Sequence, residues 1–441
     1  MLGSMASAPV TVHLLVQGSG GDVLLGPDGA VPTCEPAIED GERLVSALQR
    51  HLRGAWTVDP VILEAYLPPA VGGGAGRACL AILDSPAAGW TVPDGCRWGS
   101  NPSPLPAGLR VRAQTWRSEW AGGLKPPILR PRWSRPGWHA RAVAWIDARL
   151  AELGRPRTGP VTLVRLWSLS AMMRAPTDVG SAWFKAVFPH FEQETRVTPL
   201  LAEHVTGLVP GVLASDPHEG WLLLEEAGTP PSRERVGDDL ILGSFDQLSR
   251  AQEQLLSHSR GLEDAGCPRR PLAALADDLE QALGEWVELG GDPEPPARMS
   301  AIVGWVRATA SWIDGLGWAD TLIHGDFHPG NLLVGPGGTR IIDWSDAAIS
   351  SPVVEMAPWM GQVRPGLRSA GWDAWLTALS RFGPARDLRD GQRSVYGIGC
   401  AYQIASYAGM LREVEPATRY QLADGLNGYW KDLAAAVRAS T

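Results

Sequence analysis

Apolar residues recur at two spacings along this chain, and each spacing predicts a different kind of element. Beyond Gly228 the spacing is helical and predicts helices over residues 240–257, 271–288, 299–316, 372–382, 394–411 and 418–437. Before Gly228, short apolar runs predict strands over residues 161–169, 172–175, 182–187 and 222–225. An amphipathic helix opened by Pro136 should precede them and reach Leu153. We therefore expect a strand-rich lobe, residues 135–228, followed by a helical lobe, residues 229–441.

A short hairpin interrupts the helical half and carries polar side chains at both ends. Residues 332–334 and 339–342 predict two strands joined by the glycine-rich turn 335–338. Because a hairpin returns the chain to its own start, Asp343 should come back beside Asn331. A carboxylate and an amide oxygen that converge in this way suit Mg²⁺ holding a nucleotide phosphate. Asp326, five residues before Asn331, is left free to accept a hydroxyl proton.

The sequence HGDFHPGN at residues 324–331, followed after the hairpin by IIDW at residues 341–344, resembles a known pair of motifs. They are the catalytic loop and metal-binding segment of the aminoglycoside phosphotransferase and choline kinase family, distant relatives of the protein kinases. The resemblance implies a two-lobe protein-kinase-like fold of the α+β class, with Asp326 as catalytic base and with Asn331 and Asp343 binding Mg²⁺ beside ATP. It also implies that His324 supports the loop backbone. His328 is open between a substrate contact and packing within the loop, and packing is the expectation.

Other positions before the loop resemble nucleotide-binding features of this family. Lys185, a single lysine in an apolar run, corresponds to the lysine that reaches the ATP phosphates. Glu192 and Glu194 are both candidates for its partner on the next helix, and Glu194 is expected because it fits the family's spacing better. Pro199 indicates that this helix is divided into two short ones, because proline disrupts a helix interior. The hinge that meets the adenine should involve backbone groups around Glu225 and Ala227.

The strands within residues 161–175 should cover the phosphates. They contain no GxGxxG motif, which argues against a protein kinase. Ser168 and Ser170 are possible phosphate contacts, with an ordinary polar turn as the other interpretation.

The resemblance implies that the phosphate acceptor is a hydroxyl group of a small molecule, a metabolite or an antibiotic. Asp346 and Glu355 are the acids nearest after Asp343, too few for a polycationic aminoglycoside. Most of the 20 tryptophans should be buried in cores. Four in the helical half are candidates for lining the acceptor pocket: Trp344, Trp359, Trp372 and Trp375.

Residues 10–130 precede the kinase-like part and are rich in Gly, Pro and Ala. Strand-like runs at 11–16, 23–25 and 78–83 and a helical stretch at 41–52 predict a small α+β accessory domain. The order of elements resembles that of a Nudix domain. The domain would be a degenerate one, because the stretch that should read REXXEE reads ALQRHLRG. A metal site is therefore not expected. The connection to the kinase-like part is basic and is expected to be a solvated linker; its basic residues are Arg110, Arg112, Arg117, Lys125, Arg130, Arg132 and Arg135.

Composition narrows the class of protein. A formal charge of −9 argues against a nucleic-acid binder. No apolar run reaches the roughly 18 residues that span a bilayer, and the start resembles no secretory signal. Five scattered cysteines predict free thiols in a reducing cytoplasm. We therefore expect a cytoplasmic enzyme that binds neither membrane nor nucleic acid, with an undetermined oligomeric state.

The alternative to an enzyme is a nucleotide-binding pseudoenzyme that acts through its N-terminal domain as a partner-recognition protein. Asp326, Asn331 and Asp343 are all present, which favours the enzyme, because a pseudokinase usually lacks at least one of them.

Overall fold

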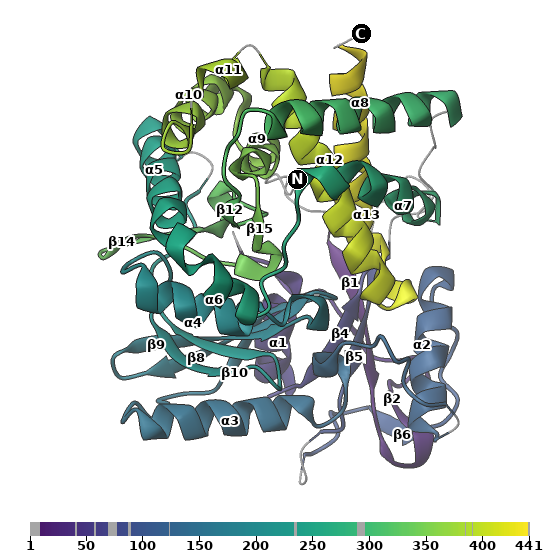
Figure 1. Cartoon of the computed structure of the whole chain (residues 1–441). Helices are drawn as coiled ribbons and strands as arrows, with labels where there is room; N and C mark the ends of the chain where they lie inside the picture. Colours follow the sequence, from purple (N-terminus) through teal and green to yellow (C-terminus); the bar gives the residue numbers. More distant parts are fainter. Residues whose placement is uncertain are drawn as a thin grey trace. The chain divides into compact units, whose positions relative to one another are not determined.

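The computed structural model describes residues 9–39, 42–56, 59–68, 77–86, 90–122, 124–232, 236–288, 296–383, 385–389 and 391–439 (Figure 1). Its contacts divide the chain into two compact units. Unit 1 comprises residues up to 188 together with residues 414–420, and unit 2 comprises residues 189–413 and 421–441. The domain boundaries expected from the sequence stay predictions.

A mixed four-stranded sheet in the order β3-β1-β5-β4 opens unit 1. Strand β1 pairs in parallel with β5 and antiparallel with β3, while β4 pairs antiparallel with β5 and β2 with β6. The elements in this part of unit 1 are β1 (Val10–Val16), β2 (Val23–Leu25), β3 (Thr33–Cys34), α1 (Leu44–Trp56), β4 (Ile62–Tyr66), β5 (Arg77–Leu83), β6 (Arg97–Gly99) and α2 (Ala107–Trp120). The expected strands and the expected helix are thus confirmed. Gly41, where that helix was expected to begin, lies outside the described residues.

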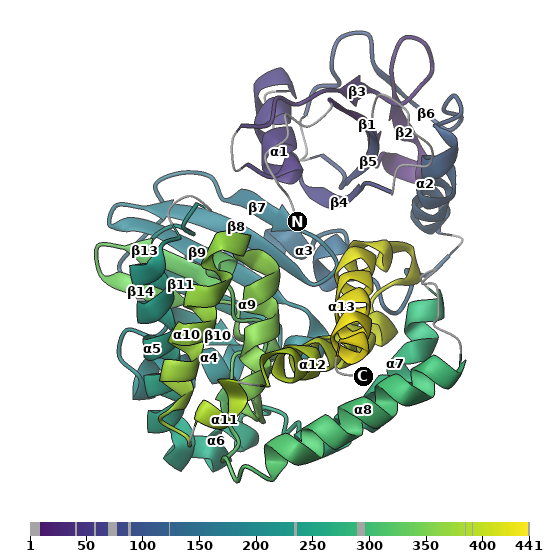
Figure 2. The same ribbon diagram turned by 90° about the horizontal axis from the view of Figure 1, so that it is seen from above.

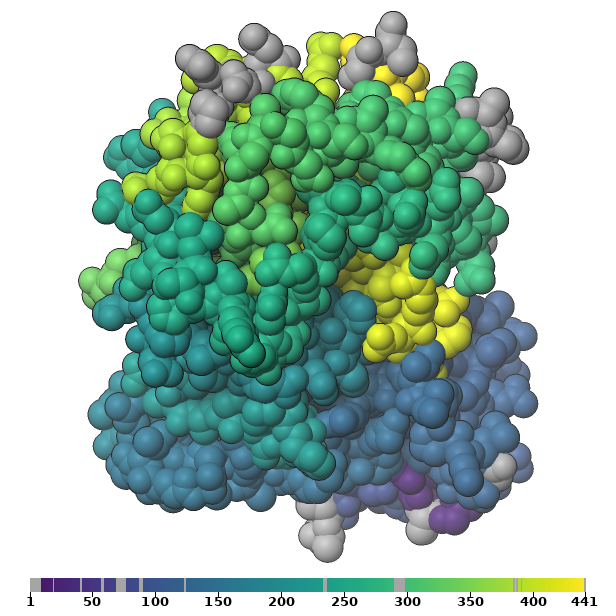
Figure 3. Space-filling model, viewed as in Figure 1, coloured from purple at the N-terminus to yellow at the C-terminus, as the bar shows by residue number. Residues whose placement is uncertain are grey.

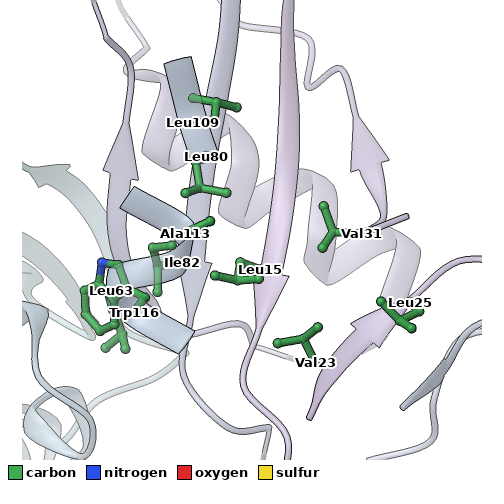
Figure 4. Packing of buried hydrophobic residues seen from close by; sticks show 10 residues of the cluster. All are labelled: Leu15, Val23, Leu25, Val31, Leu63, Leu80, Ile82, Leu109, Ala113 and Trp116. Atoms are coloured by element: carbon green, nitrogen blue, oxygen red, sulfur yellow. The ribbon is translucent and has the colours of Figure 1, made fainter. Parts of the chain in front are cut away.

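The core of this sheet forms where alternating strand residues meet one stripe of α2. Leu80 and Ile82 of β5 lie two residues apart and so point to the same face. Leu109, Ala113 and Trp116 follow helical spacing on α2 and join them in one buried cluster, shown in Figure 4.

Three further strands of unit 1 form antiparallel neighbours in the order β9-β8-β7, with α3 along one face (Figure 1). Their bounds are α3 (Trp138–Glu152), β7 (Thr162–Leu166), β8 (Ser170–Thr177) and β9 (Gly180–Val187). Trp138 and Trp145 of α3 contact the ring of Phe184, with ring centroids 6.1 and 5.9 Å apart. The expected strands and the preceding amphipathic helix are confirmed.

Helix α1 covers the outer edge of β7. Ser46 Oγ donates to the carbonyl oxygens of Leu163 and Val164, at 3.0 and 3.1 Å. Gln49 Oε1 accepts from the Leu163 N–H at 2.8 Å. These side chains satisfy backbone groups that a further strand would otherwise pair, which protects the edge. Gln49 lies in the stretch ALQRHLRG, and α1 contains no acidic residue.

A buried ionic network holds residues 414–420 in unit 1. Arg112 of α2 donates to Glu64 at 3.0 Å and to Glu415 at 2.9 Å. Arg130 donates to Glu119 at 3.0 Å and to Glu415 at 2.9 Å. None of these five side chains is more than 9% exposed. Three carboxylates and two guanidinium groups therefore share one buried site.

The expectation of a solvated basic linker is wrong for Arg112 and Arg130. Arg112 belongs to α2, a helix that the sequence did not indicate. Burial of these charges is tolerated because glutamates far away in the sequence pair with both guanidinium groups. Glu415, the shared partner, is 303 residues from Arg112.

Unit 2 is mainly helical, as expected. Helix α7 packs on α8 and α12, and α5 packs on α10 (Figure 2). Figure 3 shows α8 at the surface of this unit. The helices and first strands are α4 (Glu194–His204), β10 (Val212–Asp216), β11 (Trp221–Glu225), α5 (Asp238–Leu255), α6 (Ser259–Asp264), α7 (Leu275–Glu288), α8 (Pro296–Asp314), α9 (Met356–Gln362), α10 (Arg368–Leu379), α11 (Arg386–Arg389), α12 (Gln392–Glu413) and α13 (Tyr420–Arg438).

Helix α4 is continuous, so the expectation of two short helices divided at Pro199 is wrong. Proline lacks the N–H that would donate to the carbonyl of Thr195, four residues earlier. Ser215 Oγ donates to that carbonyl oxygen at 2.6 Å instead. A side chain from β10 thus satisfies the acceptor that proline leaves open.

All five cysteines are free, as expected. Among the described residues, no helix has the length and apolar character required to cross a membrane.

Candidate active site

The hairpin that follows the HGDFHPGN sequence forms as expected. Strands β13 (Leu332–Gly335) and β14 (Gly338–Ile341) pair antiparallel, with Leu332 opposite Ile341. Just outside this pair, the Ile342 N–H donates to the carbonyl of Asn331 at 2.9 Å. The hairpin therefore returns Asp343, the next residue, to the neighbourhood of Asn331.

Asn331 is linked directly to Asp326. Its Nδ2 donates to the Asp326 carbonyl at 2.9 Å and lies 3.4 Å from the carboxylate oxygen Oδ2. The side chain of Asp326 is 36% exposed. Its carboxylate can therefore be reached by a ligand while Asn331 fixes the backbone beneath it.

His324 supports the catalytic loop, as expected. Its ring is fully buried, and its Nε2 lies 2.9 Å from the carbonyl of Ile342. Its Nδ1 accepts from the Asp326 N–H at 3.2 Å. One nitrogen must donate while the other accepts, which requires the neutral imidazole. Burial lowers the pKa of His324 and favours the same neutral form.

His328 both packs within the loop and faces Asp326. Its Nδ1 accepts from the Gly330 N–H at 3.0 Å, which leaves the proton of a neutral ring on Nε2. That Nε2 lies 3.4 Å from the Asp326 Oδ2. The sequence favoured packing alone, because the ring's second contact depends on the folded loop.

Glu355, one of the two acids that follow Asp343 in the sequence, is buried and supports the catalytic loop instead of meeting a ligand. It is 1% exposed, and its carboxylate accepts from the backbone N–H groups of His324 and Gly325. Burial raises the pKa of Glu355 to about 8, although the two N–H donors oppose that shift. Glu355 is thus a support for the loop that carries Asp326.

Asp343 occupies a strained backbone position. It has φ 66° and is the only non-glycine residue with positive φ among those described. Such conformations cost about 1–3 kcal/mol and persist where surrounding structure imposes them. Ser345 Oγ lies 2.8 Å from the Asp343 Oδ1 and 2.7 Å from the Oε2 of Glu194. Ser345 therefore joins the expected metal ligand to the expected partner of Lys185.

Two glutamines that the sequence did not indicate support the site. Gln403 of α12 donates to the carbonyl of Gly325, and Gln193 donates to the carbonyl of Ser345 at 2.8 Å. Gly325 has φ 81°, and a Cβ there would collide with the carbonyl of Asp346. Gln403 lies 78 residues from its partner, so no local pattern could have revealed it.

The expected hinge is tied to the same hairpin. Thr229 and Val334 exchange two backbone hydrogen bonds, of 3.2 and 2.9 Å. Gly228 has φ 128°, and a Cβ at Gly335 would collide with the carbonyl of Ala227. Two glycines therefore permit the close approach of the hinge to β13. The Glu225 N–H donates to the carbonyl of Gly211 at 2.8 Å.

Lys185 lies on β9 and is 8% exposed, opposite Met172 of β8. It belongs to unit 1, and Glu194, the 2% exposed first residue of α4, belongs to unit 2. Their pairing stays a prediction.

A pocket of about 350 Å³ lies in unit 2. Asp346, Gln193 and Ser406 contribute to its wall, together with Arg270 and Asp278. Asp346 thus faces a cavity. This volume falls within the range of small-molecule sites.

The four tryptophans expected at the acceptor site are core residues instead, so that interpretation is wrong. Each is at most 5% exposed, and Trp359 stacks on Phe327 with ring centroids 5.3 Å apart. Their large rings pack in the interior of the helical unit. The four residues are Trp344, Trp359, Trp372 and Trp375.

Within the described parts of the chain, no group of three or more His, Cys, Asp or Glu could hold a metal ion alone. Asn331 and Asp343 offer an amide and a carboxylate oxygen. This set fits Mg²⁺, which keeps waters and takes phosphate oxygens beside one or two protein ligands.

Several solved structures are similar to this chain. A mutant of the aminoglycoside 2'-phosphotransferase-IIIa, in complex with GDP, has a TM-score of 0.50 and 18% identity over 68% of this chain and 100% of that chain. A choline/ethanolamine kinase family protein from Mesorhizobium loti has a TM-score of 0.46 and 20% identity, covering 68% and 99%. A macrolide 2'-phosphotransferase, MphH from Brachybacterium faecium, has 0.43 and 17%, covering 67% and 98%. No curated protein matches the sequence.

The first of these likenesses supports the two-lobe kinase-like fold of the α+β class, which confirms the expected fold. The resemblance of residues 10–130 to a Nudix domain stays untested. Residues 183–392, which include Asp326, Asn331 and Asp343, match the model of the phosphotransferase enzyme family. Over these residues the chain is similar to the phosphotransferase enzyme family, as its catalytic-loop sequence indicated.

Proposed function

We propose that this chain is an ATP- and Mg²⁺-dependent kinase that transfers the γ-phosphate to a hydroxyl group of a small molecule. The match of residues 183–392 to the phosphotransferase enzyme family supports phosphotransfer to a small molecule. The single observation that carries the rest is the state of Asp326. Its carboxylate is reachable, and its contacts in the described structure are an amide and an imidazole rather than a fixed cation.

Asp326 acts as the general base. The acceptor oxygen attacks the γ-phosphorus, the bond from that phosphorus to the bridging oxygen breaks, and the hydroxyl proton passes to the Asp326 carboxylate. Asn331 keeps the loop backbone fixed through its 2.9 Å hydrogen bond, so the carboxylate needs little reorganisation. Neutral His324 holds the Asp326 N–H from the other side.

Asn331 and Asp343 would hold Mg²⁺, and the ion would neutralise charge on the phosphate oxygens. The left-handed backbone of Asp343 and the hydroxyl of Ser345 orient its carboxylate. Lys185 contributes a further positive charge to the phosphates, with Glu194 as its partner. The hinge backbone around Glu225 and Ala227 receives the base.

The acceptor occupies the pocket beside Asp346. Gly325, whose neighbour is Asp326, packs directly on the backbone of Asp346. The pocket therefore adjoins the catalytic loop, and a volume of about 350 Å³ suits one or two small rings rather than a large polycyclic acceptor.

The test is transfer of γ-labelled phosphate from ATP to a panel of sugars, amino alcohols, nucleosides and antibiotics. We expect label on a hydroxyl of at least one class, with loss of transfer when Mg²⁺ is chelated. Mg²⁺-dependent ATP binding without hydrolysis or transfer would instead favour a nucleotide-binding pseudoenzyme acting through its N-terminal domain.

A further inference from the structure

The strand register in unit 1 places a second cation on the same sheet face as Lys185. Met172 of β8 pairs with Lys185 of β9 and, on its other side, with Arg165 of β7. Directly paired residues project from the same face of a sheet. The opposite face carries Leu163, Met173 and Phe184, and Phe184 contacts α3. Arg165 and Lys185 therefore lie in one row, on the face turned away from α3.

A β-bulge creates this arrangement. The register shifts between Leu163 and Arg165, so Val164 is an extra residue without a partner on β8. In an unbroken register Val164 would pair with Met172, and Arg165 would pair with Ala171 on the α3 face. The extra residue moves Arg165 to the face of Lys185.

Helix α1 holds the bulge from outside. Ser46 Oγ donates to the carbonyls of Leu163 and Val164, the two residues at which the register changes. Gln49 Oε1 accepts from the Leu163 N–H. The accessory helix therefore stabilises the irregularity that orients Arg165.

The turn beyond Arg165 is fixed as well. Trp133 Nε1 donates to the carbonyl of Trp167 at 2.8 Å, and Trp167 Nε1 donates to Ser170 Oγ at 2.8 Å. The guanidinium of Arg165 lies 4.0 Å from the centre of the Trp167 ring. The ring thus holds Arg165 close to the turn between β7 and β8.

We propose that Arg165 is a phosphate-binding residue that acts beside Lys185, and that the bulge held by Ser46 and Gln49 of the accessory domain positions it. A guanidinium presents a planar pair of donors that matches a phosphate. The inference rests on the proposed function, since it assigns Arg165 to the polyphosphate of the nucleotide. It gives the N-terminal segment a positioning role in nucleotide binding.

The test is calorimetric binding of Mg·ATP and of adenosine to Arg165→Gln. We expect Mg·ATP to bind about tenfold more weakly and adenosine to bind as in the parent, because a lost charge-assisted contact affects only the phosphates. Arg174→Gln is the matched control. Arg174 shares this face of β8 but lies two residues farther from the turn, where its Nε donates to Ser181 Oγ at 2.8 Å.

Unchanged Mg·ATP binding by Arg165→Gln, or an equal loss of adenosine binding, would overturn the inference. If the parent binds no Mg·ATP, the proposed function itself fails, so the two failures are distinct. Ser46→Ala tests the positioning step. It should weaken Mg·ATP binding by about fivefold and leave adenosine binding unchanged, because one neutral hydrogen bond is lost. Parent-like Mg·ATP binding by Ser46→Ala would remove the accessory domain from the account.

Discussion

The carboxylates of the two units have contrasting surroundings. In unit 1, Glu64, Glu119 and Glu415 are buried against Arg112 and Arg130. In unit 2, the carboxylate of Asp326 is partly exposed and meets Asn331 and His328, while buried Glu355 meets backbone N–H groups. In the first set, arginine side chains of the same unit pair with the carboxylates. In the second set, the carboxylate of Asp326 meets an amide and an imidazole beside the expected metal ligands.

This difference separates structural charge from functional charge. A buried ion pair is costly to break because a single charge then remains without a partner. An acid that waits for a substrate proton or a metal contributes little to folding, and its removal can leave stability unchanged. The two units should therefore respond differently to the same chemical change, from acid to amide.

The largest effect on stability is expected for Glu415→Gln. Loss of this charge leaves Arg112 and Arg130 short of a shared partner and should cost about 3–5 kcal/mol in the free energy of unfolding. Asp326→Asn is the matched control and should change stability by less than about 1 kcal/mol. Urea unfolding of both variants measures the contrast. Equal losses would mean that the two sets of acids do not differ in kind.

The next effect concerns the metal. Asp343→Ala should weaken Mg·ATP binding on the order of a hundredfold, since a charged contact of about 3 kcal/mol corresponds to that factor. Adenosine binding should stay close to that of the parent, because only the phosphates are held through the cation. Calorimetry with both ligands compares them. Parallel losses would assign Asp343 a structural role instead.

The smallest effect is a pair of pH dependences with opposite sign. Burial alone would raise the pKa of Glu415, but hydrogen bonds from Arg112 and Arg130 outweigh it and lower that pKa. Its contribution to stability is therefore lost as the solution becomes more acidic than an ordinary glutamate pKa. Burial raises the pKa of Glu355 to about 8, so stability should fall as pH rises toward 8.

Unfolding measured across pH checks both slopes, each at most about 1.4 kcal/mol per pH unit. Glu415→Gln should flatten the acid side, and Glu355→Gln should flatten the side between about pH 5 and pH 8. A Glu355→Gln protein that keeps the parent's slope there would show that another group titrates.

The sequence predicted those features of the fold that depend on residues close together along the chain. The proximity of Asp326, Asn331 and Asp343 could be predicted because the loop and hairpin are local, and a hairpin must return to its start. The strands and most helices followed from apolar spacing. Arg112 and Arg130 were misjudged because Glu415, their shared partner, is hundreds of residues away.

Pro199 was misjudged for a related reason. The rule that proline breaks a helix assumes an unsatisfied carbonyl, and Ser215 from another element satisfies it. Glu355 and Gln403 hold the catalytic loop from 30 and 78 residues away in the sequence. The residues that support the candidate site from distant parts of the sequence are thus harder to predict than those that lie within its loop and hairpin.

The most direct test of the central claim, that Asp326 is an accessible acid that takes the substrate proton, is the rate of phosphate transfer from Mg·ATP by Asp326→Asn. We expect a loss of about 10²–10⁴-fold, because an amide preserves the shape but cannot accept the proton. Mg·ATP binding should be nearly unchanged. Transfer within a factor of about two of the parent would contradict the assignment, since general-base catalysis would then have to come from another group.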